Sequence, residues 1–317
     1  MLGGIDLGGT KIQAVVVDGD HRVLGEARVP TPTTGGPPDV VAAIALALRT
    51  ACAAAGVDGA LAAVGVGSPG AIDEQEGTVS SARNLPGWEG TFAMREALEA
   101  ALGAPVALGN DVNVATDAEF ALGAASEFGS LLGVFWGTGV GGGIILDGRP
   151  WTGRGAAGEI GHIVVEVGGA RCPCGRRGCM EAYAGRGAME LRARRLVDEG
   201  RKTVLFEIMA ERGRPRLTSG IWKRALERDD DLAHELIDRA VRALGAGVAS
   251  VVNVLDVEAV VIGGGLGLKL GEPYADRIRA AMQPHLFVSD RPPAIRLAAL
   301  GDLGGASGAA LLAARAL

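Results

Sequence analysis

The sequence predicts an α/β protein made of two related domains that flank a hinged cleft. A pattern of strand, glycine-rich turn and strand opens the chain and occurs again near its middle. Helical segments separate the buried strands that follow each copy, which is typical of α/β folds. With 317 residues, of which 48% are hydrophobic, the chain is long enough for about two domains. No linker is long enough to make the two parts independent, so we expect the cleft to act as a hinge.

The first copy of the pattern lies at the N-terminus, where Gly8 and Gly9 join two short apolar strands. The predicted elements, in chain order, are strands at 1–6, 11–18 and 21–29, a helix at 39–55 capped by Asp39, a strand at 61–66, a helix at 91–102, a strand at 106–109 and a helix at 112–122. We expect residues 1–112 to form a small domain, with the C-terminal segment 303–317 packing back on it.

The second copy begins at Ser130. The predicted elements are a strand at 130–136, a turn at 137–143, a returning strand at 144–147, a helix at 232–255, a strand at 259–262 and a helix at 304–317. Residues 113–302 are expected to form a larger domain that carries a motif of three cysteines.

Composition excludes several classes of function. The net charge of −6 and a pI near 5.4 give the whole surface no attraction for a polyphosphate backbone, so nucleic acid is not expected as a partner. No window reaches the roughly 18 uncharged apolar residues that a membrane span needs, and the N-terminus lacks the pattern of a signal peptide. We therefore expect a cytoplasmic protein without a membrane partner.

Three glycine turns indicate a nucleotide site. In the stretch from Asp6 to Lys11, Gly8 and Gly9 let backbone N–H groups approach phosphate oxygens, Thr10 adds a hydroxyl donor and Asp6 can hold a hydrated Mg²⁺ ion. An ordinary glycine hairpin explains this stretch equally well when it is taken alone.

The later turns favour the nucleotide interpretation. Gly137, Thr138 and Gly139 repeat the same chemistry, and Gly263, Gly264 and Gly265 follow a buried strand where a base could lie against bare backbone. Neither a Walker A motif nor a Rossmann glycine fingerprint occurs in the chain. The remaining arrangement is that of the actin-like ATPases, the ribonuclease H-like fold, with ATP as the nucleotide.

Three of the four cysteines fall within eight residues. Cys172, Cys174 and Cys179 together with His162 make a Cys3His set, which fits a tetrahedral structural Zn²⁺ site. The alternative is three reduced thiols without metal. A catalytic zinc would keep one position open for water, whereas this set fills all four positions.

The role of Asp111 stays open on the residues alone. It follows a predicted strand, where a residue of a cleft is expected, but the residues alone favour the N-cap of the helix that follows.

Six motifs in order resemble the ROK family of sugar kinases and repressors, over essentially the whole chain. They are Asp6-Leu-Gly-Gly-Thr-Lys11, Asn84-Leu-Pro-Gly-Trp88, Asn110-Asp-Val-Asn113, Gly137-Thr-Gly-Val-Gly-Gly-Gly143, Glu159-Ile-Gly-His162 and Cys172-x-Cys-Gly-x-x-Gly-Cys-x-Glu181. Within that family the sequence looks most like the bacterial glucokinases.

The resemblance implies roles for individual residues. It makes Asp111 the catalytic base and matches the sugar-hydroxyl ligands to Asn84, Asn110, Asp111, Glu159, His162 and Glu181. It implies ATP-dependent phosphorylation of a hexose, with D-glucose giving glucose 6-phosphate, in a homodimer or homotetramer. If zinc holds one ring nitrogen of His162, the other nitrogen can face the sugar.

Other functions are also compatible with the resemblance. Kinases for N-acetylmannosamine, N-acetylglucosamine, fructose and allose share the motifs, and the donor could be ATP or polyphosphate. Gly109 and Val114 flank the Asn110 motif where other side chains are frequent, which leaves the shape of the sugar pocket open. A sugar-sensing repressor would need a helix-turn-helix domain ahead of Asp6, and none is expected so close to the N-terminus. A zinc-dependent hydrolase is not expected, because the metal set leaves no open position.

Overall fold

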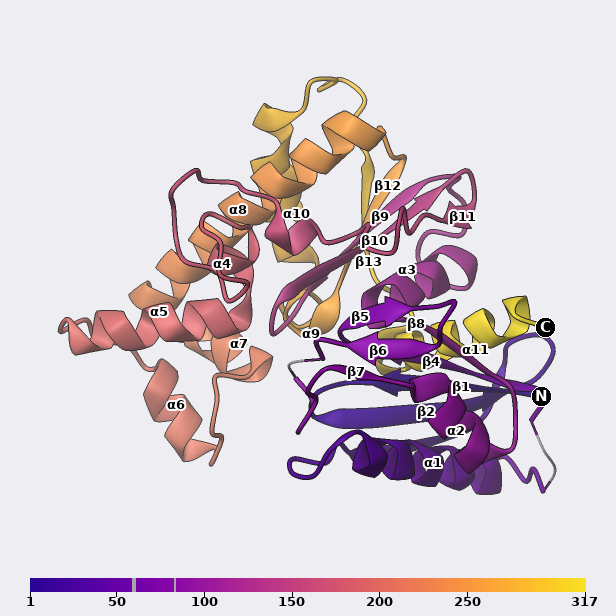
Figure 1. The fold of residues 1–317 in the computed structure, drawn as a ribbon. Helices are drawn as coiled ribbons and strands as arrows, with labels where there is room; N and C mark the ends of the chain where they lie inside the picture. The colour runs from indigo at the N-terminus through magenta and orange to yellow at the C-terminus, as the bar shows by residue number, and fades with distance from the viewer. Residues whose placement is uncertain (59–60, 83) are drawn as a thin grey trace. The chain divides into compact units, whose positions relative to one another are not determined.

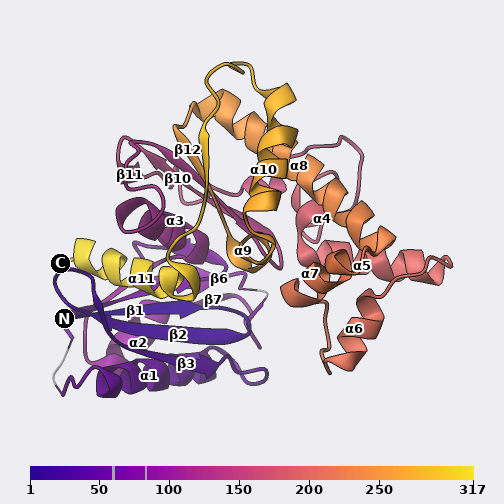
Figure 2. The same cartoon turned by 180° about the vertical axis from the view of Figure 1, so that it is seen from behind.

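The computed structural model describes residues 1–58, 61–82 and 84–317. By its internal contacts the chain forms two compact units. Unit 1 comprises Met1–Ser126, Arg149–Ala157 and Ala299–Leu317, and unit 2 comprises Glu127–Gly148 and Gly158–Ala298. Each unit is an α/β structure, coloured along the chain in Figures 1 and 2.

Unit 1 is built around a five-stranded mixed sheet in the order β3-β2-β1-β4-β8. Its elements are β1 (Leu2–Leu7), β2 (Lys11–Val17), β3 (Val23–Pro30), α1 (Pro37–Ala54), β4 (Ala63–Ser68), β5 (Ala71–Asp73), β6 (Thr78–Ser80), β7 (Thr91–Phe92), α2 (Met94–Leu102), β8 (Val106–Asn110), α3 (Asp111–Ala121), β11 (Arg149–Pro150), a 3₁₀ turn (Gly301–Leu303) and α11 (Gly304–Arg315). Strand β1 is antiparallel to β2 and parallel to β4, which is parallel to β8. Strands β5, β6 and β7 form a separate small sheet.

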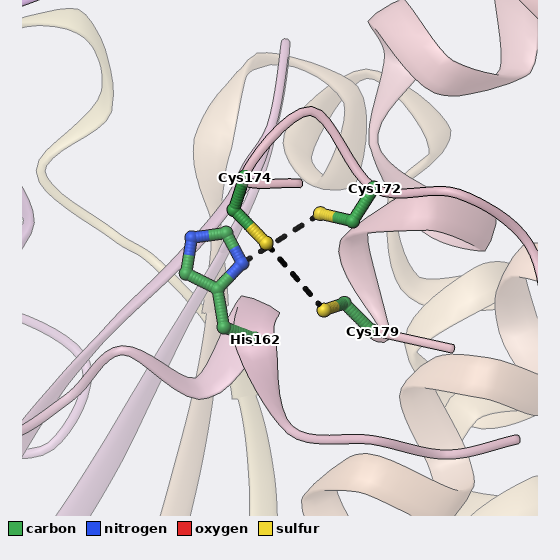
Figure 3. A group of neighbouring side chains, drawn as sticks. All are labelled: His162, Cys172, Cys174 and Cys179. Carbon is green, nitrogen blue, oxygen red and sulfur yellow. Dashed lines mark hydrogen bonds between the residues drawn. The ribbon is translucent and has the colours of Figure 1, made fainter. Parts of the chain in front are cut away.

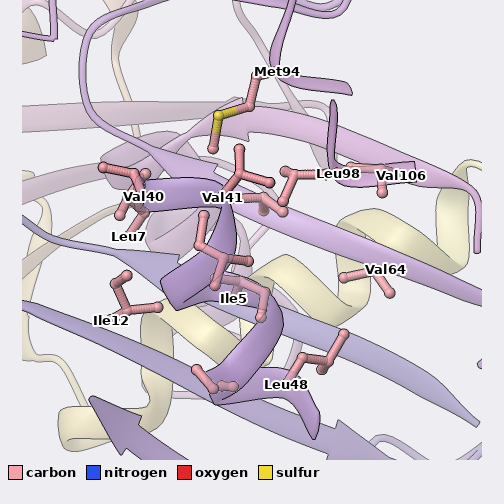
Figure 4. Close-up of a cluster of buried hydrophobic side chains, with 14 of the residues drawn as sticks. Ile5, Leu7, Ile12, Val40, Val41, Leu48, Val64, Met94, Leu98 and Val106 are labelled. Atoms are coloured by element: carbon pink, nitrogen blue, oxygen red, sulfur yellow. The ribbon is translucent and has the colours of Figure 1, made fainter. Parts of the chain in front are cut away.

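The main sheet of unit 1 is covered on both faces, so its central strands are apolar almost throughout. Successive side chains of a strand point to opposite faces. Ile5 and Leu7 of β1 therefore pack with Val40 and Leu48 of α1 in one core, shown in Figure 4. Leu2 of the same strand packs in a second cluster with alanines of α11.

The C-terminal helix α11 packs against β1 and β4 at very short range. A Cβ atom at Gly65 would lie only 1.7 Å from the carbonyl oxygen of Ala309, and one at Gly4 would lie 2.0 Å from that of Ala306. Glycine in the strands and alanine in the helix are therefore needed for this contact, because any larger side chain would push the helix away.

Helix α1 is, in the described part of the chain, the one helix long and apolar enough to cross a membrane, with a mean hydropathy of 1.3. Its buried residues, Val40, Ile44, Ala47 and Leu48 among them, belong to the core of unit 1. Burial against the sheet accounts for its apolar composition, as in the core helix of a globular domain.

Unit 2 contains strands in the order β10-β9-β12-β13 and most of the helices. Its elements are β9 (Leu131–Trp136), β10 (Val140–Leu146), a 3₁₀ turn (Ile160–His162), α4 (Glu181–Ala184), α5 (Arg186–Asp198), α6 (Leu205–Glu211), α7 (Ser219–Glu227), α8 (Asp231–Leu255), β12 (Ala259–Gly263), α9 (Gly264–Leu270), α10 (Glu272–Met282), a 3₁₀ turn (Gln283–His285) and β13 (Ala294–Leu297). The long helix α8 packs against α10 and α4.

The two units repeat one topology, which confirms the duplication that the glycine turns predict. In unit 2, β9 is antiparallel to β10 and parallel to β12, and β12 is parallel to β13. The order β10-β9-β12-β13 therefore matches β2-β1-β4-β8 of unit 1 strand by strand. The hinged cleft that the sequence predicts stays a prediction.

Several expected boundaries are wrong. Gly36 is the N-cap of α1, and Asp39 lies inside the first turn, where its carboxylate accepts a hydrogen bond of 3.0 Å from the Gly36 backbone. The second glycine turn holds only residues 137–139, because β10 already begins at Val140. Its glycines at 141–143 pair with β9 as regular strand residues. Before α2, residues 91–92 form the short strand β7 instead of helix.

The expected domain boundary after residue 112 stays a prediction. By contacts, α3 groups with unit 1, since it packs against α11 and β4.

Candidate functional site

Two predicted site residues lie at the same edge of the unit 1 sheet. Asp6 is near the carboxyl end of β1, and Asn110 is the last residue of β8. Strands β1, β4 and β8 are parallel, with Asp6 opposite Gly67 and Gly67 opposite Gly109. Two strand spacings separate Asp6 from Gly109, or about 10 Å. Ligands of open α/β sheets bind at this edge.

The carboxylate of Asp6 lies against the start of α11. A Cβ atom at Gly305 would be 2.8 Å from the Asp6 carboxyl carbon, so only glycine allows this approach. Burial raises the pKa of Asp6, the charge of Lys11 lowers it, and Asp302 raises it further. The Lys11 ammonium lies 3.0 Å from the side-chain oxygen of Gln13 and 3.7 Å from Asp302. Lys11 is thus held beside the turn and close to the Asp6 charge.

The first glycine turn is fixed by hydrogen bonds and leaves Gly9 and Thr10 exposed. The Gly8 amide donates to the Lys11 carbonyl at 2.9 Å, and the Thr31 hydroxyl donates to the Gly8 carbonyl at 2.6 Å. A Cβ atom at Gly9 would lie 3.1 Å from Cβ of Asn84. The structure therefore brings Asn84 against the first glycine turn.

Asn110, not Asp111, is the N-cap of α3. The Asn110 side-chain oxygen accepts hydrogen bonds from the amides of Val112 at 3.1 Å and Asn113 at 3.2 Å. Asp111 is the first residue of the helix, and its carboxylate accepts a hydrogen bond of 2.9 Å from Val112. A carboxylate in the first turn is favoured by the positive end of the helix dipole. The interpretation of Asp111 as the cap is therefore wrong.

Gly109 and Val114, the two departures from the common motif, lie against each other. A Cβ atom at Gly109 would be 2.8 Å from a methyl carbon of Val114. The small residue in the strand makes room for the β-branched residue one turn into the helix, so the two departures compensate in packing.

The second and third glycine turns come together in unit 2. Gly137 directly follows β9, and Gly263 ends the neighbouring parallel strand β12. A Cβ atom at Gly137 would lie 3.9 Å from the Gly265 amide nitrogen. Gly264 has a φ of +78°, and a Cβ atom there would lie 2.6 Å from the Trp136 carbonyl oxygen. Only glycine fits at position 264. The second and third glycine turns therefore meet at the strand ends without a side chain between them.

Figure 3 shows the Cys3His set as one cluster formed by His162, Cys172, Cys174 and Cys179. One ligand atom from each residue lies within 4.8 Å of all the others. The sulfur atoms of Cys174 and Cys179 are 3.8 Å apart, and Cys172 Sγ is 3.8 Å from His162 Nδ1. A tetrahedral site with Zn–S bonds of about 2.3 Å would hold two sulfurs about 3.8 Å apart. The donor set therefore fits zinc in chemistry and in spacing.

Protonation of the thiols also suits a metal. Burial raises the pKa of Cys172 to about 12 and raises that of Cys179. For Cys174 burial acts in the same direction, but hydrogen bonds from Arg176 and from the other two thiols lower its pKa to about 6. Cysteine binds metal as the thiolate, so coordination of a metal by all three sulfurs would release the protons of the thiols with raised pKa, Cys172 and Cys179.

Glu159 and Glu181 lie beside this cluster. The second ring nitrogen of His162, Nε2, is 3.8 Å from Oε2 of Glu159. One oxygen of Glu181 is 3.9 Å from the Cys172 sulfur, and the other accepts a hydrogen bond of 2.9 Å from the Val140 amide. A Cβ atom at Gly139 would be 2.3 Å from that same oxygen. Glu181 therefore connects the cysteine cluster with the second glycine turn.

Sequence reasoning missed Arg186, which reaches the second turn, and Ser219, which binds Arg186. The Arg186 guanidinium donates to the hydroxyls of Thr138 at 2.8 Å and Ser219 at 3.0 Å. No spacing in the sequence signals this contact, because Arg186 and Thr138 are 48 residues apart. Arg194, also on α5, forms an ion pair of 2.8 Å with the buried Glu190.

Known proteins resemble the whole chain. The sequence profile of the ROK family matches residues 2–316. A glucokinase from Streptomyces coelicolor is 35% identical over 314 residues, which make up 98% of this chain and 96% of that protein. An N-acetyl-D-glucosamine kinase from Salmonella newport is 34% identical over an alignment of 328 residues, covering 98% of both proteins. A solved ROK family glucokinase from Streptomyces griseus, in complex with glucose and AMPPNP, is 34% identical, with a TM-score of 0.82 and 99% of both chains covered.

The chain therefore belongs to the ROK family. Its fold is the actin-like ATPase fold of ROK kinases, which confirms the fold class predicted from the sequence.

The cap assignment can be tested through stability. Replacement N110A should lower the free energy of unfolding by about 1 kcal/mol, because the amides of Val112 and Asn113 lose their acceptor. Replacement N110S should retain most of the stability, since a serine hydroxyl also caps helices. Urea unfolding of the three proteins measures both effects. Equal stability of N110A and the wild type would contradict the cap.

Proposed function

We propose that this chain transfers a phosphoryl group from ATP to a hydroxyl of a hexose, with D-glucose as the substrate and glucose 6-phosphate as the product. One observation carries the proposal. Asp111 begins α3 directly after Asn110, the last residue of β8, and so lies at the carboxyl edge of the parallel strands, where ligands of open α/β sheets bind. The similarity to the Streptomyces glucokinases supports the same reaction.

In this proposal Asp111 is the catalytic base. Its carboxylate takes the proton of the sugar hydroxyl while the hydroxyl oxygen forms its bond to the γ-phosphorus and the bond to the β-phosphate bridging oxygen breaks. The remaining contribution of the enzyme is positioning and neutralisation of charge. The first turn of α3 places the Asp111 carboxylate at the positive end of the helix dipole, which favours a negative charge there.

The sugar hydroxyls are assigned to amide and carboxylate side chains, which supply both donors and acceptors. The proposed ligands are Asn84, Asn110, Glu159, His162 and Glu181. Asn110 can fill both roles, since its oxygen caps the helix and its amide nitrogen carries two further donors.

The glycine turns are assigned to the nucleotide. The backbone of Gly8, Gly9 and Thr10 and that of Gly137, Thr138 and Gly139 would bind phosphates through N–H groups. The residues 263–265 would lie against the base. Asp6 would hold Mg²⁺ through water and Lys11 would add positive charge near the phosphates. Magnesium supplies neutralisation of the negative charge on ATP.

We assign Zn²⁺ to the cluster of His162, Cys172, Cys174 and Cys179, as a structural ion. All four donor positions are filled by the protein, which is typical of structural sites. The ion would hold His162 by Nδ1 and so direct Nε2 toward Glu159 and the sugar. The ion would thereby position three proposed sugar ligands, Glu159, His162 and Glu181, without itself touching the substrate.

A second substrate class is supported by one comparison. The Salmonella N-acetyl-D-glucosamine kinase is as similar to the chain as the glucokinases are. A bulky 2-acetamido group would need more space than the 2-hydroxyl of glucose. The expectations of a cytoplasmic location, of a homodimer or homotetramer and of no nucleic-acid or membrane partner stay predictions.

A kinetic comparison of sugars and donors tests the proposed reaction. With ATP we expect kcat/KM for D-glucose to exceed the values for N-acetylglucosamine, N-acetylmannosamine and fructose. A coupled assay of product formation measures these values, and polyphosphate replaces ATP in a parallel series. A higher value for an N-acetylhexosamine would assign the chain to that substrate, and no product from any sugar would refute the kinase.

Removing the base tests the mechanism. Replacement D111N should reduce kcat by a factor on the order of 10² to 10⁴, the usual contribution of a positioned base. The binding of glucose, measured by calorimetry, should be kept. Replacement D39N is the matched control, because it also removes a carboxylate from the first turn of a helix. Its turnover should equal that of the wild type. Full turnover in D111N would remove Asp111 from catalysis.

The zinc assignment predicts about one Zn²⁺ per chain, because four ligands make one closed site. Replacement C174S should lose zinc and activity together, through disorder of Glu159, His162 and Glu181. Replacement C52S is the control, since Cys52 lies on α1 and belongs to unit 1. Metal analysis and the coupled assay decide the matter. A C174S protein that is active and free of zinc would show that the cluster does not position the site.

A further inference from the structure

Arg186 is attached to the second glycine turn through the backbone on both sides of its Cα atom. Its own amide donates to the Gly137 carbonyl at 3.1 Å, and the next amide, of Gly187, donates to the Thr138 carbonyl at 3.0 Å. Arg186 is also the first residue of α5, and only Gly185 separates it from the short helix α4. The start of α5 and the glycine turn thus form one rigid piece of backbone.

The Arg186 side chain is held over the turn by two hydroxyl groups. One terminal nitrogen donates to Thr138 Oγ1 at 2.8 Å and the other donates to Ser219 Oγ at 3.0 Å. These bonds use two of the five N–H donors of a guanidinium group. The planar group is therefore oriented while donors remain for another acceptor.

The charge of Arg186 is not neutralised as the charges of nearby arginines are. Arg194 and Arg216 share the buried carboxylate of Glu190, at 2.8 and 3.0 Å. Arg186 forms no ion pair within the part of the chain that the structure describes. Burial and the positive charge of Arg216 lower its pKa, and the negative charge of Glu190 raises it. A half-buried cation without an ion pair at contact distance is costly, and an anionic ligand would lower that cost.

We propose that Arg186 binds the β- and γ-phosphates of ATP and stabilises the charge on the transferred phosphoryl group. The inference rests on the proposed kinase function and adds a residue to it. The second glycine turn offers N–H groups to the same phosphate chain, and a guanidinium fork matches phosphate oxygens in pairs. Thr138 and Ser219 are positioning residues, since their hydroxyls fix the plane of the guanidinium group.

A purely structural role for Arg186 predicts a different outcome. If its side chain only joined the turn to α7 through Ser219, its loss would weaken the binding of every nucleotide alike, because the whole turn would move. A phosphate ligand acts only on nucleotides that carry the phosphates it binds. Comparison of ATP with AMP separates the two roles.

The experiment measures the binding of Mg-ATP and of AMP to the full chain by calorimetry. Replacement R186Q should weaken ATP binding by on the order of 10- to 100-fold, the loss expected for a charged hydrogen bond, and leave AMP and glucose binding unchanged. Replacement R186K keeps the positive charge but not the paired N–H donors of the guanidinium group, so the loss of ATP affinity should be smaller than in R186Q. Replacement R192Q is the matched control, because Arg192 is an exposed residue of the same helix.

The outcomes separate this inference from the function on which it rests. Unchanged ATP binding in R186Q, or an equal loss for ATP and AMP, would overturn the role of Arg186 even if the wild type phosphorylates glucose. A wild type that binds ATP through Arg186 but phosphorylates no sugar would refute the kinase and keep the phosphate ligand. If R186Q does not fold, R186K alone decides, and ATP binding equal to that of the wild type would overturn the proposal.

Discussion

Close approach of helices and side chains to glycine backbone is the constraint on which both units depend. In unit 1 the glycines of β1 and β4 let α11 pack against the sheet, and Gly65 leaves only 1.7 Å between a virtual Cβ and a helix carbonyl. In unit 2 the missing side chain of Gly139 makes room for the carboxylate of Glu181. Because interiors are close-packed, a methyl group at either place would shift the element beside it.

Glu181 links the Cys3His cluster to the second glycine turn. One of its oxygens lies near the Cys172 thiol and the other accepts the Val140 amide just after the second glycine turn. A metal in the cluster would therefore order the proposed sugar ligands and the proposed phosphate-binding turn together, although it would touch neither substrate. Such a metal would be structural in its coordination and would act on function through the residues around it.

Charge distribution in unit 2 is consistent with an anionic ligand. Glu190 neutralises Arg194 and Arg216 at short range, while Arg186 is directed by hydroxyl groups toward the glycine turn. An arginine oriented by neutral partners keeps its charge for a ligand, whereas one oriented by a carboxylate does not. The unit thus separates arginines that stabilise its own helices from one that can bind phosphate.

The sequence by itself determined the α/β class, the duplicated strand and turn pattern and the Cys3His set. The apolar periodicity of strands, the glycines of turns and the spacing of cysteines are local signals, which do not depend on contacts with distant parts of the chain. Tertiary structure alone decided that Asn110 caps α3, that residues 140–143 belong to β10 and that Arg186 reaches Thr138. Asn110 and Asp111 are both residue types that cap helices, so the sequence does not choose between them. A run of glycines is typical of a turn, and only its pairing with β9 makes residues 140–143 a strand. The contact of Arg186 with Thr138 spans 48 residues and depends on how α5 packs.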